Sequence, residues 1–287
     1  MTTRFRGDNT IGYALTIPSL LFVLVFILLP MGQAFFYSFM RWNMLGPMRF
    51  VGLANYEFLL TKDNTFAMAI LNTLVYAAAV SALTIALSLA TALLMTGQSR
   101  LEGLSRAMVF LPVIVPLAVM GLIWRMLYEP RFGFINKLLG SFGIKGLNWL
   151  FDSDLALASI VVFSVWKEFG LYALIFAGAL QRIPAELYES ARMDGAGFLR
   201  TLFRITLPSL APIMFFVVTM LSITTFKAFD HIWVMTQGGP GYATTVLVTF
   251  IYARVFDSVG IAAAASIFLF AMIFAVTMLQ FRFRREE

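Results

Sequence analysis

The chain has 287 residues, of which 60% are hydrophobic and only 13% are charged. This composition excludes an ordinary soluble domain, whose surface needs more polar residues than these to face water. The basic residues behind the net charge of +6 are scattered between apolar stretches, so neither a nucleic-acid-binding face nor a nucleic-acid partner is expected. The sequence therefore predicts an integral membrane protein surrounded by membrane lipid.

The rarest residue types limit the chemistry that the chain can perform. It has no cysteine, which excludes disulfides, thiolate metal sites and a cysteine nucleophile. Its single histidine, His231, is interpreted as a polar side chain near a membrane interface, with a role in proton relay as the alternative. Because the carboxylates are dispersed as well, a membrane-embedded enzyme is disfavoured, and no catalytic residue, metal or bound cofactor is expected.

Apolar runs predict the membrane-crossing helices. Five runs without Asp, Glu, Lys, Arg or His are long enough for the roughly 20 residues that cross a bilayer. A sixth run is interrupted only by Lys167 and Glu168, and the first run has too long an apolar core for a cleaved signal peptide. We therefore predict an all-α polytopic membrane protein with six transmembrane helices, at about residues 11–38, 66–96, 107–127, 155–181, 208–229 and 259–281.

The uncharged run Ile232–Ala253 is as long as these spans, but its composition argues against a seventh helix. It contains Gly238, Gly239 and Pro240, which break helical continuity. We expect a re-entrant or surface loop on the outer side of the membrane. Two roles stay open for it: a tight turn, or a part of the outer vestibule or of a docking surface for another protein.

The distribution of arginine and lysine predicts the orientation. With both termini in the cytoplasm, the inner segments hold 11 basic residues in 48 positions and the outer segments hold 9 in 84. Basic residues favour the cytoplasmic side of a membrane. We therefore expect two cytoplasmic termini and a cytoplasmic location for the polar segment at residues 182–207.

That polar segment is expected to form two short helices. Pro184 suits the first turn of a helix that extends to Met193, in which Glu189 and Arg192 are spaced for an ion pair. Gly195 can adopt the left-handed conformation that ends this helix, and Asp194 or a neighbour can cap a second one. On periodicity alone, an ordinary amphipathic connector at the membrane interface is the alternative.

A source of energy is missing from the chain itself. No stretch fits the phosphate-binding pattern G-x-x-x-x-G-K-[ST], and the longest segments between spans are about 30 residues, too short for an enzyme domain. ATP-driven work would have to come from another polypeptide.

The residue pattern of the polar segment resembles a known family. Glu189, Ala191 and Asp194-Gly195-Ala196, followed by Phe203, Ile205 and Leu207-Pro208, closely resemble the EAA loop of permease subunits in binding-protein-dependent ABC importers. In that family the loop is a coupling helix that docks into a cleft of the ATPase subunit. The resemblance implies that contact with an ATPase is made by Glu189, Ala191, Arg192, Asp194, Gly195 and Ala196. Ser190, where the family most often has alanine, is a minor departure.

Further stretches resemble the carbohydrate-type branch of the family, which includes the maltose and glycerol-3-phosphate permeases. They are Phe50–Tyr56, Asn72-Thr73, Phe132–Asn136, Phe226–Asp230 and Thr236–Pro240. The resemblance implies a single transmembrane domain over residues 1–287 in a bacterial or archaeal cytoplasmic membrane. It also implies a second permease subunit, two ATPase subunits that use ATP and Mg²⁺, and an extracytoplasmic solute-binding protein. The implied cargo is an oligosaccharide or other sugar, a polyol or a glycerol phosphate.

Residues of the substrate pathway are harder to choose. Lys167 and Glu168 are candidates because charges inside a span usually face a watery path or a partner, and the alternative is pairing with Lys227 or Asp230. Otherwise Lys227 and Asp230, spaced i,i+3, are expected to form a salt bridge at the interface. Aromatic faces that suit a sugar ring are offered by Trp124, Trp166 and Phe226, with packing as the alternative.

One alternative function belongs to a different class of transporter. An ion-gradient-driven secondary transporter would be expected to show broken spans at corresponding positions of two repeated halves. No such repeat is evident in the sequence.

Overall fold

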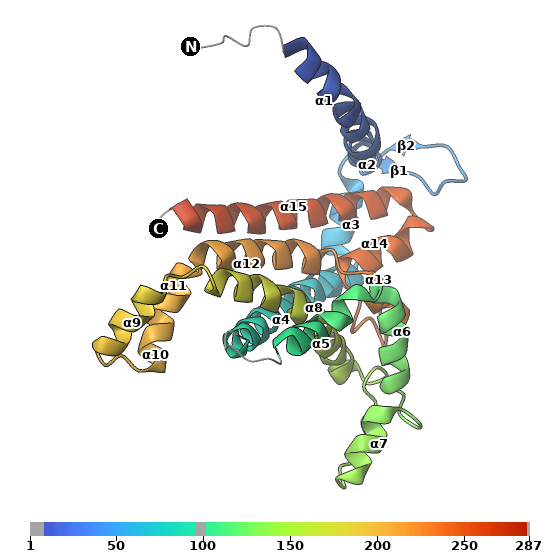
Figure 1. Ribbon diagram of the computed structural model, residues 1–287. Coiled ribbons are helices and arrows are strands. Elements are labelled where there is room, and N and C mark those ends of the chain that lie inside the picture. The colour runs from blue at the N-terminus through green and yellow to red at the C-terminus, as the bar shows by residue number, and fades with distance from the viewer. Residues whose placement is uncertain (1–8, 96–101, 286–287) are drawn as a thin grey trace. The chain divides into compact units, whose positions relative to one another are not determined.

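The structure is a computed structural model of the chain and describes residues 9–95 and 102–285 (Figure 1). Nearly all of its regular structure is helical, and the described strands are a short antiparallel pair, β1 (Met40–Arg41) and β2 (Arg49–Phe50). The prediction of an all-α polytopic protein is confirmed.

Five helices are long and apolar enough to cross a membrane: Leu15–Tyr37, Asn64–Leu94, Ser153–Leu180, Phe198–Phe226 and Val259–Arg282. A further pair of helices passes the same test together but is bent by 101° between Ile114 and Leu117. Counted as one broken span, this pair brings the number to six, as expected. Where the two membrane surfaces cut these helices stays a prediction.

The first span combines α1 (Asn9–Val23), a π-helical turn at Leu24–Leu28 and α2 (Leu29–Tyr37). The second and fourth spans are the continuous helices α4 (Asn64–Leu94) and α8 (Ser153–Leu180), and the bent third span is α5 (Glu102–Ile114) with α6 (Leu117–Leu127). The fifth span contains α10 (Phe198–Thr201), a π-helical turn at Leu202–Thr206, α11 (Leu207–Ser209) and α12 (Ala211–Phe226), and the last is α15 (Val259–Arg285). Shorter helices join the spans: α3 (Ala54–Thr61), α7 (Phe134–Ser141), α9 (Ala185–Met193), α13 (Asp230–Thr236) and α14 (Leu247–Val255).

The chain divides into two compact units, and each is described by itself. Unit 1 comprises Met1–Asp63 and Ile251–Phe268, and unit 2 comprises Asn64–Phe250 and Leu269–Glu287. Whether the chain acts as a single transmembrane domain stays a prediction.

In unit 1, one asparagine side chain joins α3 to the end of α2 and to the β1–β2 strand pair. Asn55 donates from Nδ2 to the carbonyl oxygens of Ser38 and Met40, at 2.8 and 2.9 Å. Gly260 lets α15 approach the same place, because a Cβ there would lie 1.9 Å from the Met40 carbonyl oxygen. Arg254, near the end of α14, forms a salt bridge of 2.6 Å with the buried carboxylate of Asp63, just after α3. This ion pair joins the ends of the two helices.

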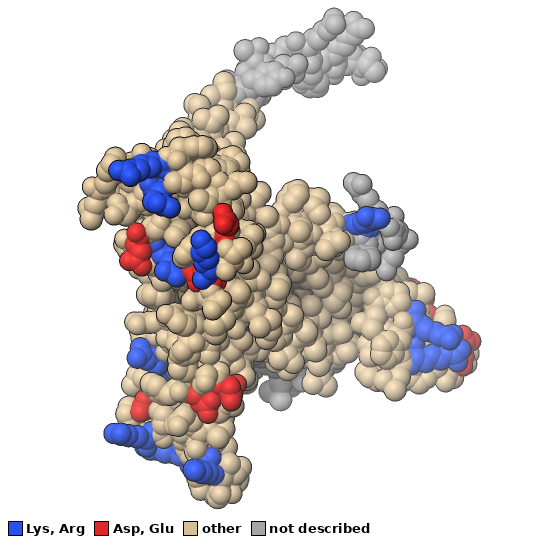
Figure 2. Space-filling model, turned by 180° about the vertical axis from the view of Figure 1, so that it is seen from behind, with Lys and Arg blue, Asp and Glu red and all other residues tan. Residues whose placement is uncertain are grey.

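In unit 2, α4 and α8 form the most extensive helix pair, and α12 packs against α4. The Ser88 hydroxyl donates to the Phe169 carbonyl oxygen at 2.8 Å, so the central pair is joined by hydrogen bonding as well as packing. Along α12, the last part of α15 is held by a 2.7 Å hydrogen bond from Gln280 to Ser222. The charged side chains of the α9–α10 segment gather at one end of this unit, beyond a broad uncharged surface (Figure 2).

The run Ile232–Ala253 is not one continuous helix. It contains the end of α13, a series of turns and the beginning of α14, so the glycines and the proline interrupt it as expected. The outer position of this loop stays a prediction.

A close approach of α5 to α8 depends on a missing side chain. A Cβ at Gly170 would lie 2.0 Å from the Val109 carbonyl oxygen, whereas nothing lies within 4 Å of a Cβ at Gly178 on the same helix. Small residues allow such backbone contacts between transmembrane helices.

We predict that Gly170→Ala destabilises the protein by about 1 to 3 kcal/mol, because the added methyl forces α5 away from α8. The matched variant Gly178→Ala should leave stability unchanged or raise it slightly, because alanine is the better helix former. Thermal unfolding of the detergent-solubilised chain measures both, and an equal effect of the two substitutions contradicts the assigned contact.

Candidate functional site

The polar segment between α8 and α12 folds as a helical hairpin of α9 and α10. Pro184 stands directly before α9 with a φ of −56°, and Gly197 stands before α10 with an extended backbone. The two helices therefore lie close to the ranges expected from proline and glycine placement. The hairpin is joined at one end to α8 and at the other to the π-helical turn that leads into α12.

The turn after α9 is a Schellman motif, which explains the spacing of its residues. The Ala196 N–H donates to the Ala191 carbonyl oxygen at 2.9 Å, and the Gly195 N–H donates to the Arg192 carbonyl oxygen at 3.0 Å. Gly195 has a φ of +68°, the left-handed conformation that this motif requires and that glycine adopts at little cost. Ala191 is buried beneath the turn, so its small side chain allows the backbone to close over it.

Asp194 is the C-cap residue that follows α9 and makes no side-chain cap for α10. Its neighbour Gly197 occupies that capping position, which agrees with the expectation that Asp194 or a nearby residue caps the second helix. The expected ion pair of the hairpin is wrong. Among the described residues, Glu189 and Arg192 are exposed and form no ion pair with each other. The expected back-bond of Ser190 is confirmed, since its hydroxyl donates to the Glu186 carbonyl oxygen at 2.8 Å.

The hairpin encloses a hollow of 740 Å³ whose walls come from three spans. Tyr188 and Thr206 face each other across it with their hydroxyl oxygens 3.2 Å apart. The remaining walls combine polar and apolar side chains from the ends of α4 and α8 and from both arms of the hairpin, namely Leu93, Leu180, Ala185, Glu189, Arg192, Ala196, Phe198, Thr201 and Leu202. Three of the six residues expected to contact an ATPase, Glu189, Arg192 and Ala196, therefore line one cavity.

Large apolar side chains stand exposed on this polar hairpin. Met193, beside the Schellman turn, is 89% exposed, and the other exposed apolar side chains of the segment are Leu187, Phe198, Leu199 and Phe203. Exposed apolar groups rimmed by charge mark a surface that contacts another protein or lipid. The hairpin thus exposes both large apolar side chains and the charged side chains of Glu189 and Arg192.

Lys167 holds the broken third span in place. Its side chain is only 6% exposed and donates from Nζ to the Val113 carbonyl oxygen at 3.1 Å. In a continuous helix that carbonyl would accept from the N–H of residue 117, but α5 ends at Ile114 and the chain turns sharply before Leu117. The lysine satisfies the carbonyl that the break releases.

The expected alternative partners of Lys167 and Glu168 are wrong. Lys227 and Asp230 are exposed and, within the described part of the chain, neither forms an ion pair with the other or with the charged pair on α8. The expected salt bridge between them is therefore not formed. Glu168 is half-buried and lies next to Lys167 on a helix that runs unbroken through both positions.

The aromatic candidates for a substrate pathway fall into two separate places. The rings of Trp124 and Trp166 have centroids 5.0 Å apart, and Phe163 packs edge-on against Trp124. Phe226 lies elsewhere, at a cavity of 220 Å³ between α4, α12 and the last part of α15. Two hydroxyl residues, Ser81 and Ser222, line that cavity with it.

The Gly238-Gly239-Pro240 loop is a tight turn held by threonine hydroxyls. Thr245 donates to the Gly238 carbonyl oxygen at 2.9 Å, and Thr244 donates to the Gly239 carbonyl oxygen at 2.7 Å. Gly238 has a φ of +89°, which favours glycine. The tight-turn interpretation is borne out by the geometry, while a role in docking stays a prediction.

Asn72 and Thr73 of α4 attach this loop to the helix core, a role that sequence reasoning missed. The Asn72 Nδ2 donates to the carbonyl oxygens of Tyr242 and Thr245, each at 3.0 Å. The Thr73 hydroxyl accepts from the Leu247 N–H at 2.8 Å. The signal available was a polar pair within an apolar span, where side-chain amides and hydroxyls normally bind a partner.

His231 is buried inside the protein, and its expected position near a membrane interface stays a prediction. It is 3% exposed, and its Nε2 lies 2.8 Å from the Tyr76 hydroxyl oxygen. Tyr76 donates to Ser164, and Ser164 donates to the Ile160 carbonyl oxygen. Only a proton on Nε2 gives every donor in this chain an acceptor, which leaves Nδ1 as a buried acceptor without a partner. Burial lowers the pKa of His231 to about 3.

The sequence has extensive similarity to known transport proteins. Residues 82–286 match the family described as binding-protein-dependent transport system inner membrane component. The probable ABC transporter permease protein YurN of Bacillus subtilis is 34% identical over 283 residues, which cover 96% of each chain. The trehalose/maltose transport system permease protein MalF of Thermococcus litoralis is 35% identical, over 97% of this chain and 96% of the relative.

Two further similarities extend this result. The sn-glycerol-3-phosphate transport system permease protein UgpA of Pectobacterium atrosepticum is 34% identical, over 97% of this chain and 95% of the relative. A solved bacterial ABC transporter involved in the import of the acidic polysaccharide alginate superposes with a TM-score of 0.82, covering 97% of this chain and 96% of that chain. Its identity of 22% shows a shared fold alone.

We predict that Asn72→Asp loosens the loop after α13. The substitution preserves side-chain size but removes both donors, so the carbonyls of Tyr242 and Thr245 lose their partner at a cost of about 1 to 3 kcal/mol. Hydrogen exchange over residues 237–246 should accelerate, with exchange in α12 unchanged as the internal control. Unchanged exchange in the loop would show that Asn72 does not hold it.

We also predict a pH dependence that comes from His231, which lies in α13 outside the candidate spans. Because its folded-state pKa is lowered from 6.5 to about 3, its contribution to stability is present above pH 6.5 and is lost as the pH falls. From pH 7 to pH 5 the loss should reach about 2 kcal/mol. In His231→Gln, whose amide can still donate to Tyr76, this part of the pH dependence should vanish; thermal unfolding at both pH values measures it.

Proposed function

The chain belongs to the family of binding-protein-dependent transport system inner membrane components, and from this premise we propose how it couples ATP hydrolysis to the movement of a solute. It is a multi-pass permease of an ABC importer, because the family match covers residues 82–286 and the relatives named as permeases align over nearly the whole chain. This finding displaces the alternative of an ion-gradient-driven secondary transporter. The proposal concerns the cargo, the partners and the residues that make contact with them.

The partners that we propose are a second permease subunit, two ATPase subunits and an extracytoplasmic solute-binding protein. A solved structural neighbour is a bacterial alginate ABC transporter in complex with a periplasmic protein that holds an alginate pentasaccharide, which supports the last of these. The ATPase subunits would bind ATP and Mg²⁺, since this chain lacks the phosphate-binding loop. We place both termini in the cytoplasm on the density of basic residues.

The α9–α10 hairpin is proposed as the contact with the ATPase. The observation that carries this proposal is the Schellman turn, in which Gly195 and Ala196 close over the buried Ala191 and hold the exposed Met193 at a fixed place. A turn whose backbone hydrogen bonds are satisfied can move as a rigid body when a partner displaces it. Glu189, Arg192 and Asp194 would border the contact with charge.

ATP binding would act on this hairpin by favouring one of two conformations of the permease pair. A ligand shifts such an equilibrium only through its different affinities for the two states. Because the hairpin continues into α8 on one side and into α12 on the other, its displacement would move two spans together. The binding protein loaded with solute would favour the outward-facing state, and nucleotide would close the ATPase pair.

The proposed cargo is a sugar or a related solute, such as an oligosaccharide, a polyol or a glycerol phosphate. Two relatives are named as permeases for trehalose and maltose and for sn-glycerol-3-phosphate, which supports this class. Phe226 with Ser81 and Ser222 offers an aromatic face beside two hydroxyls, the combination that suits a polyhydroxylated ring. We propose this cavity as one wall of the pathway.

The other pathway candidates have weaker support. Lys167 is engaged with the Val113 carbonyl oxygen, so we assign it a positioning role at the broken span. Trp124 and Trp166 pack on each other within an aromatic cluster, and Glu168 follows Trp166 by two residues on α8. These residues would shape the pathway through the position of α6.

We predict that Gly195→Val lowers solute uptake and solute-dependent ATP hydrolysis about tenfold, because a β-branched residue is disfavoured by 1 to 2 kcal/mol or more at a positive φ. No side chain lies within 4 Å of a Cβ at this position, so the effect comes from backbone conformation alone. Uptake by membrane vesicles and ATPase activity of the purified importer are the two measurements.

Two controls make this test specific. Gly195→Asn should retain most activity, because asparagine tolerates the left-handed conformation. Gly197→Ala should also retain it, because Gly197 has a φ of −73° and open space around it. Full activity of Gly195→Val, with the importer assembled to the normal level, refutes the proposed role of the turn.

A further inference from the structure

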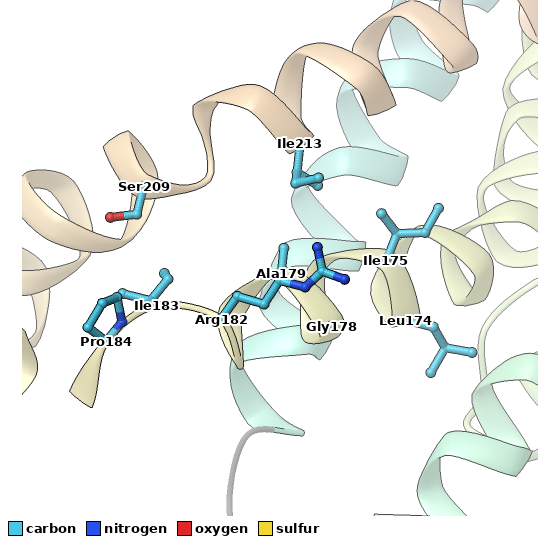
Figure 3. Close-up of a pocket in the computed structure, with 9 residues that line it drawn as sticks. All are labelled: Leu174, Ile175, Gly178, Ala179, Arg182, Ile183, Pro184, Ser209 and Ile213. Atoms are coloured by element: carbon cyan, nitrogen blue, oxygen red, sulfur yellow. The ribbon is translucent and has the colours of Figure 1, made fainter. Parts of the chain in front are cut away.

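A second cavity lies beside the hairpin, between the ends of two candidate membrane spans. It has a volume of 510 Å³ and is formed by the last two turns of α8, the connection to α9, the end of α11 and the beginning of α12 (Figure 3). Its walls are apolar side chains from both helices, Leu174, Ile175, Ala179, Ile183 and Ile213. The polar side chains that line it are Arg182 and Ser209. This groove is distinct from the hollow enclosed by the hairpin, with which it shares no lining residue.

Small residues keep the groove open. Nothing lies within 4 Å of a Cβ built on Gly178, and the next residue along the wall is Ala179. Gly178 has an ordinary helical conformation and is exposed, so no turn geometry and no close contact explains a glycine there. Glycine within a helix costs about 1 kcal/mol relative to alanine. The role left for Gly178 is the open space that a missing side chain provides in the groove.

Arg182 places a positive charge at the mouth of this apolar groove. In Figure 3 its side chain turns back along α8 toward Ala179 and lies between that helix and Ile213. Within the described residues no hydrogen bond or ion pair holds its guanidinium. The acidic residues of the neighbouring hairpin, Glu186, Glu189 and Asp194, do not line the groove.

The groove carries a positive charge at one end and is lined by apolar side chains along the rest of its length. The apolar span of α8 ends at Leu180, and Arg182 follows two residues later, at the level where arginine meets lipid headgroups. Ile175 and Ile213 lie one to two turns deeper, inside spans of their own. A ligand that fits must carry an anionic group at one end and an apolar chain at the other.

We propose that this groove binds an anionic phospholipid, with its phosphate on the Arg182 guanidinium and an acyl chain along Gly178, Ile175 and Ile213. Guanidinium groups bind phosphate through two parallel charge-assisted hydrogen bonds, and no internal carboxylate competes for this one. A sugar is a poor occupant, because just two of the lining side chains, Ser209 and Arg182, could form hydrogen bonds with its many hydroxyls. The inference does not depend on the direction or the cargo of transport.

The test uses the full chain, purified in detergent together with any subunits that accompany it. Native mass spectrometry compares retention of phosphatidylglycerol with that of phosphatidylcholine of the same chain length. The unaltered protein should prefer the anionic lipid about fivefold, the effect expected of one arginine near a headgroup. Arg182→Gln should remove this preference, and Gly178→Leu should reduce binding of both lipids by filling the groove.

Arg200→Gln is the matched control, since Arg200 is an exposed arginine of α10 outside the groove. It should retain the preference. Equal losses in Arg182→Gln and Arg200→Gln would show general attraction of a basic segment to anionic lipid and overturn the proposal. Competition by inorganic phosphate would identify a soluble anion as the ligand instead, and unchanged retention in Gly178→Leu would show that no acyl chain enters.

Discussion

The rest of the structure depends on one constraint, which is that backbone hydrogen-bonding groups inside a bilayer must find partners within the protein. Continuous helices such as α4 and α8 meet this requirement by themselves. The informative places are those where a helix ends or breaks. There, single side chains supply the hydrogen-bond donors that a continuous helix would supply. Lys167 donates to the carbonyl oxygen of Val113, and Asn72 donates to two carbonyl oxygens of the loop after α13. These polar residues in apolar spans are therefore fixed by the breaks that they satisfy.

The same reasoning shows what sequence alone could predict. Long apolar runs predicted helices and their number, because length and composition are enough to identify a spanning segment. The α9–α10 hairpin was also predictable, since proline, glycine and the Ala191-to-Ala196 spacing specify local geometry. By contrast, the partners of Lys167, Asn72 and His231 lie far away in the chain. Nothing in a single sequence places Val113 beside Lys167, so pairing with Lys227 or Asp230 was an equally consistent expectation.

Glycine illustrates why residue type is a weak guide to role. Gly170 and Gly260 are needed because a backbone carbonyl of another segment occupies the place of a side chain. Gly195 is needed for its positive φ and has open space around it. Gly178 has neither constraint, and the space beside it belongs to a groove. The amino-acid sequence does not distinguish these three roles of glycine, because each depends on the backbone conformation and on which atoms of other segments approach the Cα.

The arrangement of unit 2 gives the hairpin a direct mechanical connection to the proposed pathway. α8 carries the hairpin at its end and Trp166 and Lys167 near its middle, and Lys167 in turn holds the carbonyl at which the third span breaks. α12 begins beyond the hairpin and ends at Phe226, beside the small hydroxyl-lined cavity. A displacement of Met193 therefore need not pass through long loops, because short connections join the hairpin to α8 and α12, and these two helices reach the candidate residues. Since the cores of such helix pairs pack into discrete arrangements, a small movement at the hairpin can select between two positions of both helices.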